Sequence, residues 1–177
     1  MLQGEDEVVI TLHFMDAGLD SGPILTKQPF PLTPETQIGD VYAYSEQVTP
    51  ELFVEVVDGL EAETIEADPQ PENPGEALRC YPRIPEDSRI DWSRSAQYLD
   101  RLVRASSEPL PGAYTYLDGQ RLTVWRAHVE QPETEILGTP GQVAHRRPDN
   151  GTVAIVTNSG FLVLEEVSLN GGNRHSA

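Results

Sequence analysis

The chain has 177 residues, enough for one ordinary domain or two small ones, and 38% of them are hydrophobic. No apolar run reaches the ~20 residues that a membrane-spanning helix needs, and we expect no export leader at the start of the sequence. The single cysteine, Cys80, excludes an internal disulfide and fits a reducing, cytoplasmic location.

The formal net charge is −17, and most of it lies in the first half of the chain. Residues 1–90 carry 19 acids and 4 bases, whereas residues 91–177 carry 10 acids and 8 bases. Lys27 is the only lysine, a pattern that fits either a high-salt source or an ordinary acidic surface. In dilute salt such a chain repels a polyanion such as tRNA, but molar salt screens that repulsion within ~3 Å.

The first elements that the sequence predicts are two strands joined by a loop. Residues 8–14 are rich in β-branched and apolar side chains and predict a buried strand. Residues 16–23 contain two glycines and a proline and predict a loop, and residues 24–32 predict a second strand.

Helical patterns follow the second strand. Thr33 is placed to cap a helix that opens at Pro34, and Thr49 is placed to cap another that runs to about Glu63. Four apolar residues are expected on one inward face of the second helix: Leu52, Val56, Val57 and Leu60.

Residues 67–78 hold three prolines and a glycine and predict a linker across the surface. Next, a helix is expected from about Arg94 to Ala105, with Trp92 packing nearby. Its inward residues are expected to be Leu99, Leu102 and Val103.

Short strands fill the rest of the chain. Residues 113–127 predict a β-hairpin that turns at Asp118-Gly119. Three more strands are expected at 142–144, 152–157 and 161–167, and this spacing favours a small barrel. The end of the chain, residues 168–177, is expected to be frayed.

The segment with the most chemical content lies between the first two strands. His13 ends a strand, and Asp20 follows it in a loop that Gly18 and Gly22 flank. A carboxylate beside an imidazole suits acid–base chemistry, because each charge stabilises the other. By residue type alone, a structural role for both side chains remains the more common case.

This segment resembles the signature loop of the folate-dependent formyltransferases, whose form is His-Phe-x₅-Asp-x-Gly-x-Ile. The matching residues are His13, Phe14, Asp20, Gly22 and Ile24.

Three later segments resemble the same family in the same order. Residues 81–92 resemble the stretch that joins the catalytic and C-terminal domains. Residues 102–113 resemble an Arg-Ala…Pro-x-Pro-Gly-Ala segment, and residues 140–143 resemble a Pro-Gly-x-Val turn. The resemblance covers roughly residues 8–167 and favours the subgroup that has a C-terminal barrel.

The resemblance implies a fold and a domain organisation. Residues 1–66 would be an α/β remnant of a Rossmann-like catalytic domain, residues 67–108 a linker and connecting helix, and residues 109–177 a small OB-like β-barrel. The family's Asn-x-His segment should lie upstream of His13 and has no counterpart there. This absence predicts a fragment that is inactive alone: a split gene whose N-terminal half a separate chain supplies, a truncated gene model, or a remnant.

The resemblance also implies roles for named residues. Asp20 would move protons as an acceptor amine attacks a formyl group, and His13 would orient the Asp20 loop, with a purely structural role for His13 as the alternative. Four further residues would shape the loop or the acceptor side, although salt bridges or packing explain the last three at least as well: Gly22, Tyr81, Arg83 and Arg104.

The function implied is transfer of a formyl group from 10-formyltetrahydrofolate to a primary amine, in the cytoplasm and without a membrane partner. The acidic balance favours an amino-sugar nucleotide as the acceptor over methionyl-tRNA. A non-catalytic binding module is the third possibility, carried by six arginines: Arg101, Arg104, Arg121, Arg126, Arg146 and Arg147. No zinc-ligand spacing, phosphate-binding glycine loop or nucleophilic serine or cysteine setting is found in the sequence.

Overall fold

The computed structural model describes residues 1–71, 73, 80–134 and 137–177, and the chain divides into two compact units. The hairpin–helix unit comprises residues 5–36 and 40–82. The β-rich unit comprises residues 1–4, 37–39 and 83–177.

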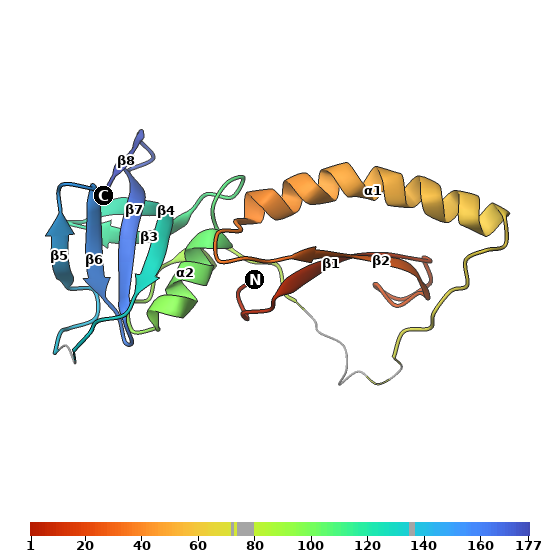
Figure 1. The fold of residues 1–177 in the computed structure, drawn as a ribbon, viewed down its shortest axis with the longest axis horizontal. Coiled ribbons are helices and arrows are strands. Elements are labelled where there is room, and N and C mark those ends of the chain that lie inside the picture. The colour runs from red at the N-terminus through yellow and green to blue at the C-terminus, as the bar shows by residue number, and fades with distance from the viewer. Residues whose placement is uncertain (72, 74–79, 135–136) are drawn as a thin grey trace. The chain divides into compact units, whose positions relative to one another are not determined.

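The hairpin–helix unit begins with two antiparallel strands, β1 (Glu7–His13) and β2 (Ile24–Pro31), drawn in red and orange in Figure 1. Val8 pairs with Phe30 and Leu12 with Thr26, and the register shifts at His13, where the connecting loop begins. Both strands were expected from the sequence, and their bounds agree with the prediction within a residue.

The helix of this unit, α1 (Ile38–Glu61), is one continuous helix with Pro50 inside it. The expectation of two helices, capped by Thr33 and Thr49, is therefore wrong. Thr33 instead closes a short turn, because its amide donates to Thr36 Oγ1 at 2.9 Å and its carbonyl accepts from the Thr36 amide at 3.1 Å. Proline removes one helical hydrogen bond. The helix nevertheless continues, and it makes tertiary contacts before Pro50 and buries side chains after it.

These contacts lie along one side of α1. Before Pro50, the Tyr44 ring lies 4.6 Å from the Phe30 ring of β2, and its hydroxyl accepts from Gln28 Nε2 at 3.0 Å. After Pro50, Leu52 and Val56 are buried as expected. Val57 and Leu60, expected on the same inward face, are exposed.

The segment after α1, expected to be a linker, also pairs with the hairpin. Asp68 exchanges two backbone hydrogen bonds with Ile24, of 2.7 and 2.8 Å, so the start of the expected linker joins the hairpin. The rest of that prediction, residues 72 and 74–78, lies outside the described residues. The described part of the hairpin–helix unit contains no parallel strand pair, so Rossmann-like character here stays a prediction.

The β-rich unit opens with a 3₁₀ turn, η2 (Pro85–Ser88), and helix α2 (Ala96–Arg104). Ser95 caps α2 by accepting from the Tyr98 amide at 3.3 Å. The predicted inward residues of this helix, Leu99, Leu102 and Val103, are all buried, and Trp92 packs against the same core. The α2 prediction is confirmed.

Six strands follow α2 and form one antiparallel sheet (Figure 1). They are β3 (Ala113–Leu117), β4 (Gln120–Glu130), β5 (Val143–Arg147), β6 (Thr152–Val156), β7 (Phe161–Leu169) and β8 (Arg174–Ser176). The order is β3-β4-β7-β6-β5, with β8 added to β7. The β3–β4 turn has positive φ at Asp118 and Gly119, as the predicted hairpin turn requires.

The predicted closed barrel is wrong. Among the described strands, no pairing joins β5 to β3, so the sheet is an open path. Its apolar face is covered by α2 instead, because Leu99 and Val103 pack with Val124 of β4 and Leu162 of β7 in one core cluster.

The C-terminal tail, expected to be frayed, is also ordered. Strand β6 pairs with β7 only as far as Leu164, and β8 pairs with the rest of β7, from Glu166 opposite Ser176 to Ser168 opposite Arg174. The unpaired edge of β7 beyond β6 offers hydrogen-bonding groups that β8 satisfies.

An ion pair links strands that are not hydrogen-bonded neighbours. The Arg147 guanidinium of β5 donates two hydrogen bonds of 2.8 Å to the Glu130 carboxylate of β4. This bidentate contact lowers the pKa of Glu130 below its usual 4.5, against a smaller opposing effect of burial.

The Glu130 pair predicts a specific acid sensitivity. Because the folded pKa is lower than the unfolded one, the pair stabilises the fold above pH 4.5, and this contribution is lost as the pH falls through the folded pKa. We expect Glu130→Gln to flatten the decline of melting temperature with acid below pH 4.5. Glu133→Gln, an exposed carboxylate in the next loop, is the control and should leave that decline unchanged. Identical curves for both variants and the parent would contradict the prediction.

Candidate functional site

The candidate site is the loop between β1 and β2, which brings together the two residues that the sequence singled out. His13 Nε2 lies 3.8 Å from Asp20 Oδ1. The imidazole is 24% exposed and the carboxylate 81% exposed. At this separation the contact is electrostatic rather than a hydrogen bond, and the carboxylate is open to a bound molecule.

Backbone contacts fix the orientation of the imidazole. His13 Nδ1 lies 2.8 Å from the Phe14 carbonyl oxygen, and a carbonyl only accepts, so Nδ1 carries the hydrogen in this bond. The Phe14 amide donates to the Pro23 carbonyl at 2.9 Å, which closes the base of the loop. Nε2 is therefore the nitrogen that faces Asp20.

The loop itself is held by side-chain hydrogen bonds. Asp16 Oδ1 accepts from the Gly18 amide at 2.9 Å and from Ser21 Oγ at 2.8 Å. Asp20 has φ of 54°, a left-handed conformation that aspartate tolerates better than most residues. This turn presents the Asp20 carboxylate to solvent.

Gln70 is a site residue that the sequence reading missed. Its Nε2 donates to the Asp20 carbonyl at 3.0 Å and to the Gly22 carbonyl at 2.7 Å, so one side chain fixes the backbone on both sides of Ser21. Gln70 lies 50 residues after Asp20, inside the proline-rich segment that reads as a linker. Nothing local in the sequence marks it.

Gly22 is required by close packing of the loop backbone. A Cβ at this position would lie 1.7 Å from the Phe14 carbonyl oxygen, and that oxygen cannot move freely because it also accepts from His13 Nδ1.

We therefore expect Gly22→Ala to lower stability by about 1–3 kcal/mol and to separate His13 from Asp20. Thermal melting and the His13 imidazole NMR signals measure the two effects. The control is Gly172→Ala, whose Cβ would meet only the Leu169 carbonyl, at 3.1 Å. A Gly22→Ala variant with unchanged melting and imidazole signals would contradict this prediction.

Arg83, an expected acceptor-side residue, serves the fold of the β-rich unit. Its guanidinium donates to the Ala105 carbonyl at 3.0 Å, to Ser106 Oγ at 3.1 Å and to Ser88 Oγ at 3.2 Å. These bonds tie η2 to the end of α2. Tyr81, by contrast, is 91% exposed.

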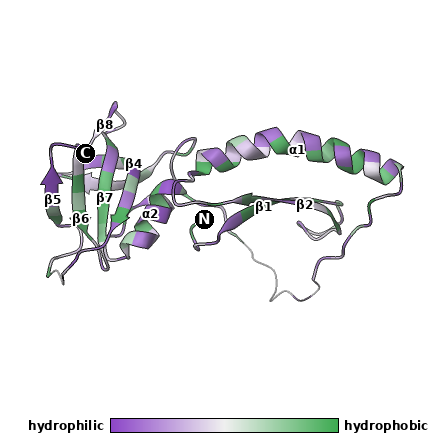
Figure 2. Ribbon diagram, viewed as in Figure 1, coloured by the Kyte–Doolittle hydropathy of each residue, from purple (hydrophilic) through white to green (hydrophobic). Residues whose placement is uncertain are grey.

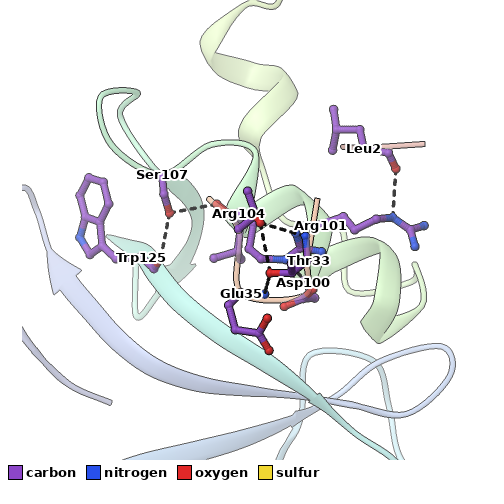
Figure 3. Close-up of polar contacts among 10 residues, drawn as sticks. Leu2, Thr33, Glu35, Asp100, Arg101, Arg104, Ser107 and Trp125 are labelled. Atoms are coloured by element: carbon purple, nitrogen blue, oxygen red, sulfur yellow. Dashed lines mark hydrogen bonds and ion pairs between the residues drawn. The ribbon is translucent and has the colours of Figure 1, made fainter. Parts of the chain in front are cut away.

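Arg104 is likewise engaged within the β-rich unit. Its Nε donates to Asp100 Oδ2 at 2.9 Å, one turn earlier in α2, and both side chains are largely buried (Figure 3). Burial raises the pKa of Asp100, and the bond to Arg104 opposes that rise. Figure 3 also shows Arg101 donating to the Leu2 carbonyl, at 3.1 Å, and Ser107 Oγ donating to the Trp125 carbonyl, at 2.8 Å.

The arginines that suggested a binding surface mostly have partners inside the unit. Arg147 pairs with Glu130 and Arg126 with Glu166. The Arg121 guanidinium lies 4.1 Å from the centre of the Tyr114 ring. Such engagement is typical of arginines that stabilise the fold rather than of a free basic surface.

The described part of the chain offers neither a metal cluster nor a membrane-spanning helix. There, no group of three or more histidine, cysteine, aspartate or glutamate side chains is arranged to hold a metal ion. None of the described helices combines the length and the apolar character needed to cross a bilayer.

The family model described as "Formyl transferase, C-terminal domain" matches residues 83–177, more than half of the chain. The chain belongs to the formyltransferase family. The family assignment expected from the signature loop and the three later segments, as a C-terminal portion, is thereby confirmed.

The curated relatives of this formyltransferase chain include methionyl-tRNA formyltransferases. That of Geotalea uraniireducens is 33% identical over 176 residues, which cover 98% of this chain and 53% of the relative. That of Citrifermentans bemidjiense is 34% identical over 176 residues, 98% of this chain and 52% of the relative. The chain thus spans about half the length of the curated relatives it matches.

Solved formyltransferases share the fold. An N-formyltransferase from Helicobacter canadensis, in complex with folinic acid and dTDP-3-aminofucose, has a TM-score of 0.66 at 19% identity, over 92% of this chain and 56% of that one. Methionyl-tRNA formyltransferase from Clostridium thermocellum has a TM-score of 0.56 at 19% identity, over 88% of this chain and 59% of that one. The expected preference for an amino-sugar acceptor is not specifically favoured by these relatives.

Proposed function

We propose that this chain provides the proton-handling part of a formyltransferase that acts on methionyl-tRNA. The observation that carries the proposal is the 33% identity to a methionyl-tRNA formyltransferase along 98% of the chain, which includes the His13–Asp20 loop. The sequence had favoured an amino-sugar acceptor because of the acidic charge. Identity along the whole chain is more specific than net charge, so methionyl-tRNA becomes the first candidate.

The chemistry of the loop suits formyl transfer to an amine. The formyl donor, 10-formyltetrahydrofolate, supplies an activated one-carbon acyl group when bound. An amine that takes the formyl group, with tetrahydrofolate as the leaving group, must lose a proton, and Asp20 Oδ1 is the exposed base proposed to take it. His13 Nε2, when protonated, stabilises the Asp20 carboxylate from 3.8 Å.

The residues present fit this proton-handling role. Asp20 is open to an incoming amine, while Gln70 and Asp16 hold the loop backbone so that the carboxylate keeps its direction. Pre-positioning of this kind reduces the entropy lost at reaction. No contact with the folate is assigned to these residues.

The domain organisation proposed from the sequence accompanies this function. Residues 1–66 would be the C-terminal part of the Rossmann-like catalytic domain, residues 67–108 the linker and connecting helix, and residues 109–177 the C-terminal β-domain. The fold shared with solved formyltransferases over 88–92% of the chain supports this division.

Formylation of an amino-sugar nucleotide is the second candidate. It is favoured by the net charge of −17, which opposes binding of a polyanion, and by the fold shared with the Helicobacter canadensis enzyme.

A direct assay separates the candidates. This chain would be fused behind the N-terminal half of the Geotalea uraniireducens enzyme, the half that it does not match, and supplied with 10-formyltetrahydrofolate. We expect formylation of methionyl initiator tRNA and none of dTDP-3-aminofucose. The reverse result would establish the second candidate, and failure with both acceptors would favour a non-catalytic module. The same assay on the chain alone tests the expectation that it is inactive without that half.

A further inference from the structure

The described residues of the hairpin–helix unit form no core cluster of their own. Its buried apolar side chains, among the described residues, are Leu52 and Val56, both on α1. The two clusters of buried core residues found in the structure belong to the β-rich unit. A two-stranded hairpin is marginal in water unless further strands or a helix cover its apolar face.

One side of α1 carries apolar side chains that the described residues leave partly exposed. Tyr42 is 46% exposed, Phe53 61%, Val57 40% and Leu60 36%. The spacing of Phe53, Val57 and Leu60 by four and three residues puts them on one face, and Tyr42 lies three turns earlier on the same face. We call these four residues the α1 strip.

The α1 strip continues the buried face of the helix. Leu52 and Val56 precede Phe53 and Val57 by one residue each, so the strip widens the apolar side of α1 beyond its buried residues. Figure 2 shows hydrophobic and hydrophilic residues alternating along α1. An exposed apolar stripe of this kind marks a surface that another protein element covers.

We propose that the α1 strip is the docking surface for the N-terminal half of a formyltransferase, the half of the relatives that this chain does not match. The proposal rests on the proposed function. It is argued from chain length, because 176 matched residues are only 53% of the Geotalea uraniireducens enzyme, and from the incomplete core.

Charge adds a condition on the docking partner. Helix α1 carries six acidic residues, from Asp40 to Glu61, and no basic one. The surface that covers the α1 strip should therefore be apolar at its centre and basic at its rim, because a like-charged rim disfavours association.

Thiol reactivity tests the docking directly. Val57→Cys, made in a Cys80→Ser background, places a reactive group in the strip. Val54→Cys is the matched control, because Val54 is 58% exposed on the flank of α1 that holds Glu51, Asp58 and Glu61. Both variants would be alkylated in the isolated chain and in the fusion with the N-terminal half described above. We expect alkylation at position 57 to slow several-fold in the fusion only, and alkylation at position 54 to stay equally fast in both.

The outcomes distinguish the proposals. Equal reactivity at position 57 in the isolated chain and in the fusion would overturn the docking surface, even if the fusion formylates an acceptor. Protection at position 57 without formylation would retain the docking surface and overturn the proposed function. Protection in the isolated chain would also overturn it, and a doubled mass in light scattering would then identify a second copy as the occupant.

Discussion

Replacing Asp20 with Asn in the fused, two-halved enzyme is expected to lower kcat for formyl transfer by about 10²–10⁴-fold. Asparagine has nearly the same shape as aspartate but cannot accept the amine proton. The Asp20 side chain is 81% exposed, and its ion pair within the described part of the chain is the 3.8 Å contact with His13, so its loss should leave the melting temperature unchanged. A large loss of kcat without loss of stability is the signature of a group that takes part in the chemistry.

Asp16→Asn is the matched control for this variant. Asp16 lies in the same loop, and the amide oxygen of asparagine retains an acceptor for the Gly18 amide and Ser21 Oγ. Its kcat should stay close to that of the parent. Steady-state kinetics with saturating acceptor separate kcat from KM, and equal kcat for Asp20→Asn and the parent would remove Asp20 from the mechanism.

The second large effect concerns stability. Leu99→Ala is expected to destabilise the β-rich unit by about 2–5 kcal/mol, because the deletion leaves a cavity where neighbours relax only in part. Leu99 is fully buried on α2, which contacts β4 and β7, and it belongs to the core cluster that contains Val124 and Leu162.

Urea unfolding measures this loss, and Leu117→Ala is the control. Leu117 is the same residue type at the end of β3, but it is 54% exposed, so its truncation should change the free energy of unfolding little. For a unit of about 100 residues, each kcal/mol corresponds to a melting shift of about 4–8 °C. Similar losses for both variants would mean that α2 does not hold the sheet as the structure describes.

Local sequence patterns determined much of the fold. The apolar, β-branched run before the Gly22 loop and the residues after it predicted β1 and β2, and the spacing of Leu99, Leu102 and Val103 predicted α2. The Asp118-Gly119 turn predicted the β3–β4 hairpin, because few residues other than glycine, asparagine and aspartate adopt positive φ without strain.

The wrong predictions concern elements whose structure depends on residues far away in the sequence. Pro50 reads as the start of a helix, yet α1 runs through it, with Tyr44 against Phe30 before it and Leu52 buried after it. The sequence predicted a frayed tail, yet Arg174–Ser176 pair with the free edge of β7 and form β8. The strand spacing suggests a barrel, yet α2 covers the sheet and leaves its path open.

For the candidate site, the sequence by itself determined which residues matter: the His13–Asp20 spacing and the glycine at position 22 are local features that resemble a family signature. Only the tertiary structure decided what holds them. Gln70 reaches back 50 residues to two carbonyls of the loop, and Arg83 turns out to bind the end of α2. Hydrogen bonds between segments far apart in the chain leave no periodicity or spacing in the sequence, because chain folding alone brings such donors and acceptors together.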